Sequence, residues 1–230
     1  MKMVGLIGGM SWESSAEYYR LLNQGVRDRW GPTASARCLL WSFDFAEIER
    51  LQHAGDWDAL TEGMIDAARR LEDAGADLLL ICTNTMHRTA PAIEAAVGIP
   101  LLHIADPTAA AIRAAGLSRV GLLGTAFTMK QDFYRGRLRD RHGLEVIVPP
   151  TEDRATVHRI IYDELIAGIV SPASRDAYRA VIARLVAAGA QAIILGCTEI
   201  MLLLDAQDSA VPLFDTTALH ARAAIDAALA

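Results

Sequence analysis

The stretches AGADLLLICT (residues 74–83) and AGAQAIILGC (residues 188–197) resemble each other across 114 positions of one chain. Two further pairs occur in the same order: VGLIG at 4–8 with VGLLG at 120–124, and IPLLHIAD at 99–106 with VPLFDTTA at 211–218. Because the three spacings are nearly equal, the sequence predicts two copies of one folding unit.

Each copy alternates strand-like and helix-like segments. SAEYYRLLNQGVRDRW at 15–30 and ALTEGMIDAARRLEDAGA at 59–76 have helical spacing, and the second is predicted to stop at Gly75. Alternation of this kind is typical of α/β proteins, in which helices cover parallel sheets.

The predicted fold is therefore an α/β protein with two pseudo-symmetric lobes, each a short parallel sheet flanked by helices. The first lobe is predicted to comprise residues 1–106 plus 213–230, and the second residues 107–212. Since ligands of open α/β sheets bind beyond the carboxyl ends of the strands, we expect an active site in the cleft between the lobes.

Composition excludes several function classes. The chain has 230 residues and 52% of them are hydrophobic, which is enough for a large core. Its net charge is −6. No run of Lys and Arg is present, so no nucleic-acid partner and no membrane surface is expected. The apolar runs are too short to span a bilayer, and MKMVGLIGGMSWESS at the start lacks a signal-peptide cleavage site, so a cytoplasmic protein is predicted.

The cysteine and glycine patterns predict no cofactor. Cys38, Cys82 and Cys197 form no CxxC and no Cys/His pair, which disfavours a disulfide framework and a metal site. The glycines of GLIGGM do not match the dinucleotide-binding spacing, and no phosphate-loop lysine follows.

Four loops at predicted strand ends are rich in small hydroxyl and amide residues: GGMSWES (8–14), TNTMH (83–87), GTAFT (124–128) and CTEI (197–200). One such loop would be an ordinary turn with helix-capping residues. Four at matched strand ends favour a site for a carboxylate or phosphate.

Cys197 is the best single candidate for chemistry, because a thiolate can act as a base or a nucleophile. The alternative is a buried, inert thiol, the role assigned here to Cys38. His87, His103 and Glu199 lie near strand ends, where each could orient a catalytic group, bind an amino group or simply begin a helix.

The internal repeat predicts which residue of the pair Cys82 and Thr83 belongs to the site. At the spacing of 114 residues, Thr83 is equivalent to Cys197 and Cys82 to Gly196. Because strand side chains alternate between faces, Thr83 is expected to share the orientation of Cys197. Cys82 is then expected to point into the packing of the lobe.

The motifs GLIGGMSWESSAEYY, CTNTMH and GCTEI, followed by IPLLHI and VPLFD, resemble the cofactor-independent aspartate/glutamate racemase family over essentially the whole chain. The resemblance implies two pseudo-symmetric α/β lobes that bind one small amino acid, no pyridoxal phosphate, no metal, and a homodimer. It also implies two acid/base groups, one from each lobe, because inverting an α-carbon requires removing a proton on one face and returning one on the other.

The resemblance assigns the catalytic positions to Thr83 and Cys197. In the family both are usually cysteines, so Thr83, a far weaker acid than a thiol, should make racemisation less efficient. The substrate-binding residues expected with them are Met10, Ser11, Asn84, Thr85, Thr125, Thr128, Thr198, Glu199 and Arg50.

The residues expected around the substrate side chain depart from the family pattern. Typical aspartate racemases use an Arg after the second strand and a Lys in the second lobe. Here only Arg50 is available, and Ile166 stands at the Lys position. The sequence therefore predicts either that Arg50 acts alone or that the accepted side chain is not acidic.

Three functions follow from these residues. The first is a racemase of aspartate, glutamate or a related small amino acid. The second is a decarboxylase or cis–trans isomerase of small dicarboxylic acids on the same fold. The third is a non-catalytic amino-acid-binding protein, against which the intact GCTE motif at Cys197 argues.

Overall fold

The computed structural model describes all 230 residues and divides into two compact units. The first unit comprises Met1–Ile104 and His220–Ala230, and the second comprises Ala105–Leu219. The crossing at 104/105 lies close to the predicted boundary at 106. The return at 219/220 lies later than the predicted 213, because strand β8 (Leu213–Asp215) pairs with β7 in the second sheet.

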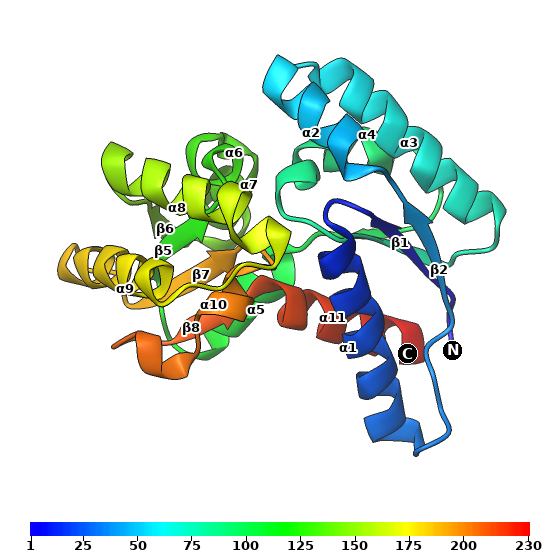
Figure 1. Cartoon of the computed structure of the whole chain (residues 1–230). Helices are drawn as coiled ribbons and strands as arrows, with labels where there is room; N and C mark the ends of the chain where they lie inside the picture. The colour runs from blue at the N-terminus through cyan, green and yellow to red at the C-terminus, as the bar shows by residue number, and fades with distance from the viewer. The chain divides into compact units, whose positions relative to one another are not determined.

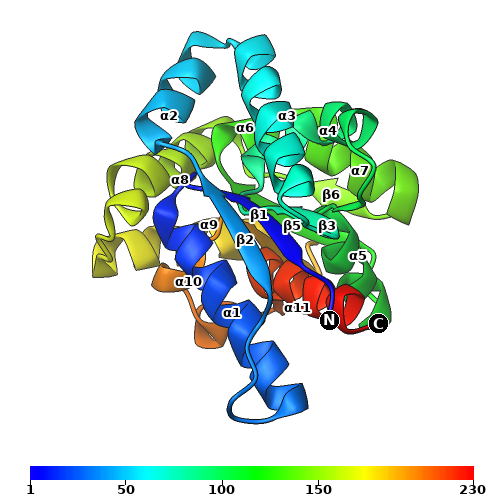
Figure 2. The same ribbon diagram turned by 90° about the vertical axis from the view of Figure 1, so that its right-hand side faces the viewer.

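The first unit is built on a four-stranded parallel sheet in the order β2-β1-β3-β4. On one face lie α1 and the C-terminal part of α11, and on the other lie α2, α3 and α4 (Figure 1). Figure 2 views this unit from the side of its edge strand β2. The elements are β1 (Val4–Gly8), α1 (Trp12–Trp30), β2 (Cys38–Ser42), α2 (Phe45–Ala54), α3 (Trp57–Asp73), β3 (Leu78–Ile81), the 3-10 helix η1 (Thr85–Thr89), α4 (Ala90–Ala96), β4 (Leu101–Leu102) and α11 (Thr216–Leu229).

The second unit repeats this plan with a parallel sheet in the order β6-β5-β7-β8. One buried apolar cluster joins one face of the sheet to α8, α9 and α10. Helices α5 and α7 pack against each other and contact β8 and β6. The elements are α5 (Ala105–Ala114), β5 (Arg119–Gly124), α6 (Ala126–Lys130), α7 (Asp132–His142), β6 (Glu145–Ile147), α8 (Thr151–Asp163), η2 (Leu165–Ala167), α9 (Pro172–Ala187), β7 (Ala192–Gly196), α10 (Ile200–Leu203), η3 (Ala206–Asp208) and β8.

The duplication extends to the register of strand pairing. Ile7 of β1 lies opposite Ile81 of β3, and Leu123 of β5 lies opposite Leu195 of β7. These pairs are related by the same spacings of 116 and 114 residues that relate the sequence motifs. The predicted repeat is therefore confirmed at the level of individual residue pairs.

Helix α3 shows how local sequence produces these elements. It begins after Asp56, whose side chain accepts a hydrogen bond from the amide of Ala59 at 3.1 Å. It ends before Gly75, which has a φ of +94°, a conformation that favours glycine. The predicted stop at Gly75 is confirmed. The residues that α3 buries follow helical spacing and are Leu60, Met64, Ala67, Ala68 and Leu71.

Two segments of the first unit are interrupted or short. The chain after the TNTMH loop forms two separate helices, η1 and α4, and Pro91 lies in the first turn of α4. Proline lacks an amide proton and clashes with a preceding helical turn, so a new helix begins at this point. Within the repeat motif at 99–106, only Leu101 and Leu102 form ladder pairs, and α5 begins at Ala105.

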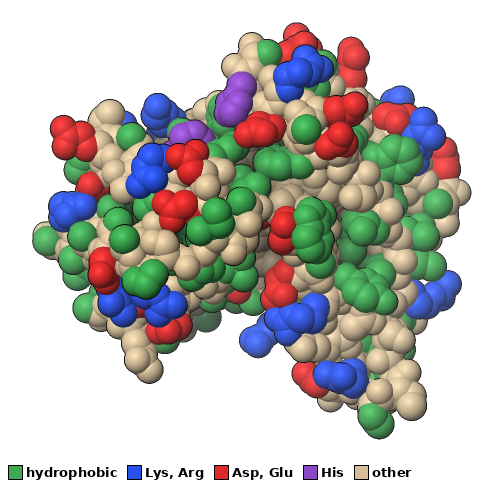
Figure 3. Space-filling view, viewed as in Figure 1, with side chains coloured by type: hydrophobic (Ala, Val, Ile, Leu, Met, Phe, Trp, Pro, Cys, Tyr) green, Lys and Arg blue, Asp and Glu red, His purple; other side chains and the backbone are tan.

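Charged side chains of both signs are scattered over the visible face of each unit (Figure 3). None of the helices combines the length and the apolar character needed to cross a bilayer.

Candidate active site

In the first unit, the loop after β3 carries Cys82 and Thr83, of which the sequence assigns only Thr83 to the site. Cys82 is fully buried and packs with Leu6, Tyr18 and Leu22 between the sheet and α1. Burial raises the pKa of the Cys82 thiol, which keeps it protonated and unreactive. Thr83, the next residue, is only partly buried. The prediction that Cys82 points into the packing is confirmed.

The neighbouring loop after β1 is shaped by glycine and serine. Gly9 has a φ of +83°, and a Cβ atom at this position would lie 2.2 Å from the carbonyl oxygen of Phe43. The Ser15 hydroxyl accepts from the Gly9 amide at 2.8 Å and donates to the Ser11 carbonyl at 3.1 Å. Ser11 also caps α1, where its side chain accepts from the Ser14 amide at 3.4 Å.

Three other predicted residues of the first unit are buried. Asn84 and Thr85 lie in the turn that begins η1, and both are almost fully enclosed. Met10 packs its side chain into the apolar cluster between the sheet and α3. Only the backbone of Met10 is therefore placed to meet a polar ligand.

In the second unit, Cys197 follows the last residue of β7 and forms a compact group with its neighbours. The Cys197 thiol donates a hydrogen bond to Glu199 Oε2 at 2.9 Å, and the Thr198 hydroxyl donates to the same oxygen at 2.7 Å. Glu199 is buried, with 5% of its surface exposed. Burial, followed by the negative charge of Glu199, raises the pKa of the Cys197 thiol well above its ordinary value. Cys197 therefore rests as a protonated thiol.

Tyr178 of α9 is a further residue of this group, and the sequence analysis missed it. It is fully buried, and its hydroxyl donates to the carbonyl of Val157 at 3.4 Å. Burial raises its pKa, and the negative charge of Glu199 raises it further. Tyr178 belongs to the apolar cluster against which Cys197 packs. No motif marks this residue, because only the packing of α9 against the sheet brings it into the cluster beside Cys197.

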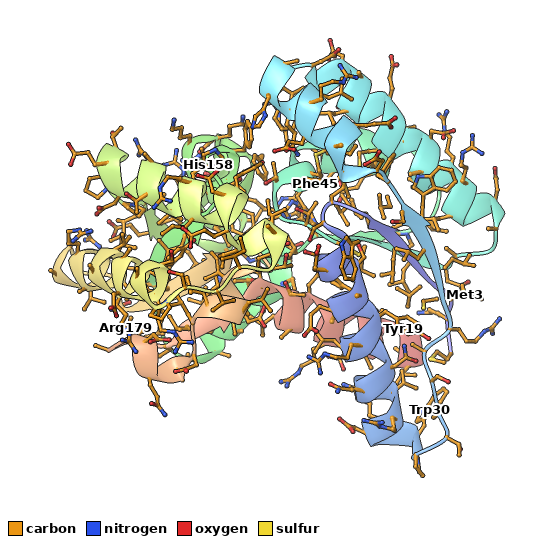
Figure 4. The ribbon with its side chains drawn as sticks, in the orientation of Figure 1. Met3, Tyr19, Trp30, Phe45, His158 and Arg179 are labelled. Carbon is orange, nitrogen blue, oxygen red and sulfur yellow. The ribbon has the colours of Figure 1, made fainter.

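The strand end beside Cys197 depends on two glycines. A Cβ atom on Gly124 of β5 would lie 2.8 Å from the carbonyl oxygen of Gly196 of β7. Directly after Gly124, the Thr125 hydroxyl caps α6 by accepting from the amide of Thr128 at 3.3 Å. The Ala126 amide donates to Nδ1 of His158 on α8, which is labelled in Figure 4.

The two positions predicted to contact the substrate side chain, Arg50 and Ile166, lie in different environments. Arg50 is exposed on α2, whose buried residues are Ile48 and Gln52. At 100° per residue, Arg50 lies on the opposite face of that helix. Ile166 is partly buried in η2 and packs against the apolar cluster of the second unit.

No group of three or more His, Cys, Asp or Glu side chains is arranged to hold a metal ion. The predicted residues thus form two groups, each within its own unit. The first contains Met10, Ser11, Thr83, Asn84 and Thr85, and the second contains Thr125, Thr128, Cys197, Thr198 and Glu199.

Comparison with known proteins identifies the family. The family model for Asp/Glu/hydantoin racemases matches residues 7–224. The broad specificity amino-acid racemase RacX of Bacillus subtilis is 30% identical over 178 residues, which are 76% of this chain and 75% of RacX.

Solved structures agree with this match. The crystal structure of a candidate Asp/Glu racemase from Yersinia pestis is 57% identical, with full coverage of both chains and a TM-score of 0.94. An aspartate racemase homologue from Pyrococcus horikoshii is 33% identical, also with full coverage of both chains, and has a TM-score of 0.86. A glutamate racemase from Francisella tularensis, solved with D-glutamate, is 17% identical over 98% of this chain and 80% of its own, and its TM-score of 0.71 shows the shared fold. The chain therefore belongs to the Asp/Glu/hydantoin racemase family and is an isomerase, an amino-acid racemase.

Proposed function

We propose that this racemase acts on aspartate, glutamate or a related small amino acid by two-base proton transfer and without a cofactor. Thr83 and Cys197 are the proposed acid/base residues, and they exchange protons with opposite faces of the α-carbon. The observation that carries the proposal is their equivalence. Each follows the corresponding strand of a duplicated sheet, and the pairing registers of the two sheets match around them.

The group around Cys197 supports a role in proton transfer. As a thiol it can return a proton to a carbanion directly. To remove an α-proton it must first become a thiolate, and Glu199 is the hydrogen-bonded acceptor for the proton that is lost. In that step the S–H bond breaks, an O–H bond forms on Glu199, and the thiolate then takes the proton from the α-carbon.

Thr83 makes proton transfer on the two faces of the α-carbon unequal. Its hydroxyl can donate a proton to a carbanion, but its alkoxide is rarely available as a base. We therefore expect removal of the α-proton on the Thr83 face to be slow. Exchange of the α-proton on the Cys197 face should therefore be faster than full racemisation, which needs Thr83 in both directions.

The substrate range is proposed from the two side-chain positions. Ile166 supplies no charge, so Arg50 is the one cation left from the expected pair. The hydroxyl and amide residues of the four strand-end loops are proposed to bind the α-carboxylate, a role common at such turns.

Proton NMR in heavy water tests the function. We would incubate the enzyme with L- and D-aspartate, L- and D-glutamate and neutral amino acids, and follow loss of the α-proton signal. Exchange that disappears in Cys197→Ala supports the proposal. Loss of a carboxylate without α-proton exchange would indicate a decarboxylase, and bound amino acid without any exchange would indicate a binding protein. Activity should also survive chelators and carbonyl reagents, and its loss with restoration by a metal or pyridoxal phosphate would contradict the proposal.

We also propose that the enzyme works in the cytoplasm as a homodimer. The cytoplasm keeps cysteine thiols reduced, and all three cysteines of this chain are free. The proposed dimer surface is one side of α1, where Trp12, Tyr19 and Trp30 are 68%, 56% and 55% exposed. These side chains fall within about 20° on a helical wheel. Tyr19 and Trp30 are labelled in Figure 4.

A second copy of the chain suits this surface because α1 carries acidic Glu13 in its first turn and basic Arg27 in its last. Two copies packed antiparallel would bring opposite charges together. Analytical ultracentrifugation should show a dimer that the double variant Tyr19→Arg, Trp30→Arg dissociates. A monomeric wild type, or a dimer unaffected by the double variant, would contradict this proposal.

A further inference from the structure

We propose that His87 is the positioning residue for Thr83: its neutral imidazole, with the proton on Nδ1, holds the Thr83 carbonyl against the backbone that follows the neighbouring strand. The inference rests on the proposed catalytic role of Thr83. It assigns His87 no contact with the substrate.

Both ring nitrogens of His87 are occupied by backbone groups of fixed polarity. Nε2 lies 3.1 Å from the Ile104 amide, which can only donate, so Nε2 accepts and carries no proton. Nδ1 lies 2.8 Å from the Thr83 carbonyl oxygen, which can only accept, so Nδ1 carries the proton. Only 1% of the surface of His87 is exposed, so bulk water does not compete for either hydrogen bond. These partners determine a neutral ring of one tautomer.

The two hydrogen bonds of His87 join two chain segments beyond the last pair of the β3–β4 ladder. The ladder between β3 and β4 pairs only Leu79 with Leu101 and Leu80 with Leu102. Beyond it the chain turns into η1 on one side and α5 on the other. His87 connects the two segments at this end of the sheet. Its hydrogen bonds take the place of a ladder bond at Thr83, the proposed acid/base residue.

Two further buried histidines pack around the ring of His87. His220 of α11 lies with its ring centroid 5.7 Å from that of His87, and His103 lies 4.5 Å away. His220 Nε2 donates to the carbonyl of Leu102 at 2.8 Å, and its Nδ1 accepts from the Tyr18 hydroxyl of α1 at 2.7 Å. Because the Leu102 carbonyl can only accept, Nε2 of His220 carries a proton, which is the opposite ring nitrogen from the protonated one of His87.

The arrangement predicts a defect confined to one face of the substrate. We define Thr83-dependent exchange as the α-proton exchange in heavy water that Thr83→Ala abolishes. His87→Leu keeps an apolar side chain in the site but removes both bonds, and it should lower Thr83-dependent exchange about ten-fold, or about 1.4 kcal/mol. Exchange at Cys197 should stay within about two-fold, since Cys197 and its partners belong to the other unit. In a Thr83→Ala background, His87→Leu should change nothing further.

Tyr18→Phe is the matched control. It removes one buried hydrogen bond from the same histidine cluster and leaves both bonds of His87 in place. We expect a lower melting temperature with exchange unchanged on both faces. A His87→Leu effect that is equal on both faces, or that adds fully to Thr83→Ala, would overturn the inference and indicate general loosening.

Nitrogen NMR provides a test that does not require the variant to fold. Two-bond proton–nitrogen correlations on wild-type protein with labelled histidine should show one buried ring protonated on Nδ1 and another on Nε2. Absence of the Nδ1 tautomer overturns the inference while leaving the racemase proposal in place. If instead the wild type exchanges no α-proton of any amino acid, the proposed function fails and the inference fails with it.

Discussion

Replacing Cys82 by alanine separates packing from chemistry. The side chain is fully buried in the cluster that joins the first sheet to α1 and α11. Removing the sulfur forfeits the burial of roughly one to two methylene groups, at about 0.8 kcal/mol each, and leaves a small cavity. The expected loss is about 1 to 2 kcal/mol of unfolding free energy. For a chain of this size that is a fall of about 2 to 8 °C in melting temperature.

The activity of the same variant should stay within a few-fold of wild type, because the Cys82 side chain is enclosed in the apolar cluster of the first unit. Circular dichroism melts and α-proton exchange in heavy water measure the two effects on one preparation. Cys38→Ala is the control, since Cys38 is only partly buried in the same cluster and should cost less stability. Cys197→Ala should show the reverse pattern, with normal melting and almost no exchange. A Cys82→Ala variant as inactive as Cys197→Ala, with unchanged melting, would refute the register of this loop.

Three further predictions concern charge. Substrate range should extend beyond aspartate because Ile166 replaces the expected cation, and kcat/KM for aspartate, glutamate and neutral amino acids measures it; a strict aspartate preference abolished by Arg50→Ala would show that Arg50 suffices. Glu199→Gln removes the negative charge that helps raise the pKa of Cys197, so the pH midpoint of Cys197 alkylation by iodoacetamide should fall by about one pH unit or more. Mass spectrometry in a Cys38→Ser background measures this midpoint. An unchanged midpoint would show that Glu199 does not set the pKa. Burial raises the pKa of Asp106, but hydrogen bonds from Arg137 at 2.7 and 2.6 Å and from His142 at 2.9 Å outweigh it and lower that pKa, so the stability this carboxylate contributes is present above its unfolded pKa and is lost as pH falls through the folded one. Asp106→Asn should therefore cost about 1 kcal/mol in urea unfolding at neutral pH and nothing in strong acid, and an equal cost at both would point to packing instead.

Much of the architecture could be read directly from the chain. Buried strands alternate with amphipathic helices, and a local signal such as Gly75 marks where a helix stops. The repeat relates Thr83 to Cys197, and strand alternation then separates Thr83 from Cys82. These inferences succeed because they depend on residues close in sequence or on comparison of the chain with itself.

Other features depend on contacts that no local pattern encodes. The return of the chain to the first unit at His220 is set by the pairing of β8 with β7, and strand pairing is a long-range choice. Met10 carries a motif residue, yet its side chain is taken up by the apolar core. Arg50 lies on the exposed face of α2 because Ile48 and Gln52 occupy the buried one.

The polar groups around the proposed bases likewise divide into features that the sequence predicts and contacts that only packing creates. Sequence alone determined that a thiol, a threonine hydroxyl and several small polar loops stand at matched strand ends. Only the tertiary structure decided that Glu199 accepts a hydrogen bond from Cys197 and that Tyr178 lies in the apolar cluster against which Cys197 packs. It also decided that His87 accepts from Ile104, since a hydrogen bond between segments exists only after packing brings donor and acceptor within 3.1 Å and excludes water.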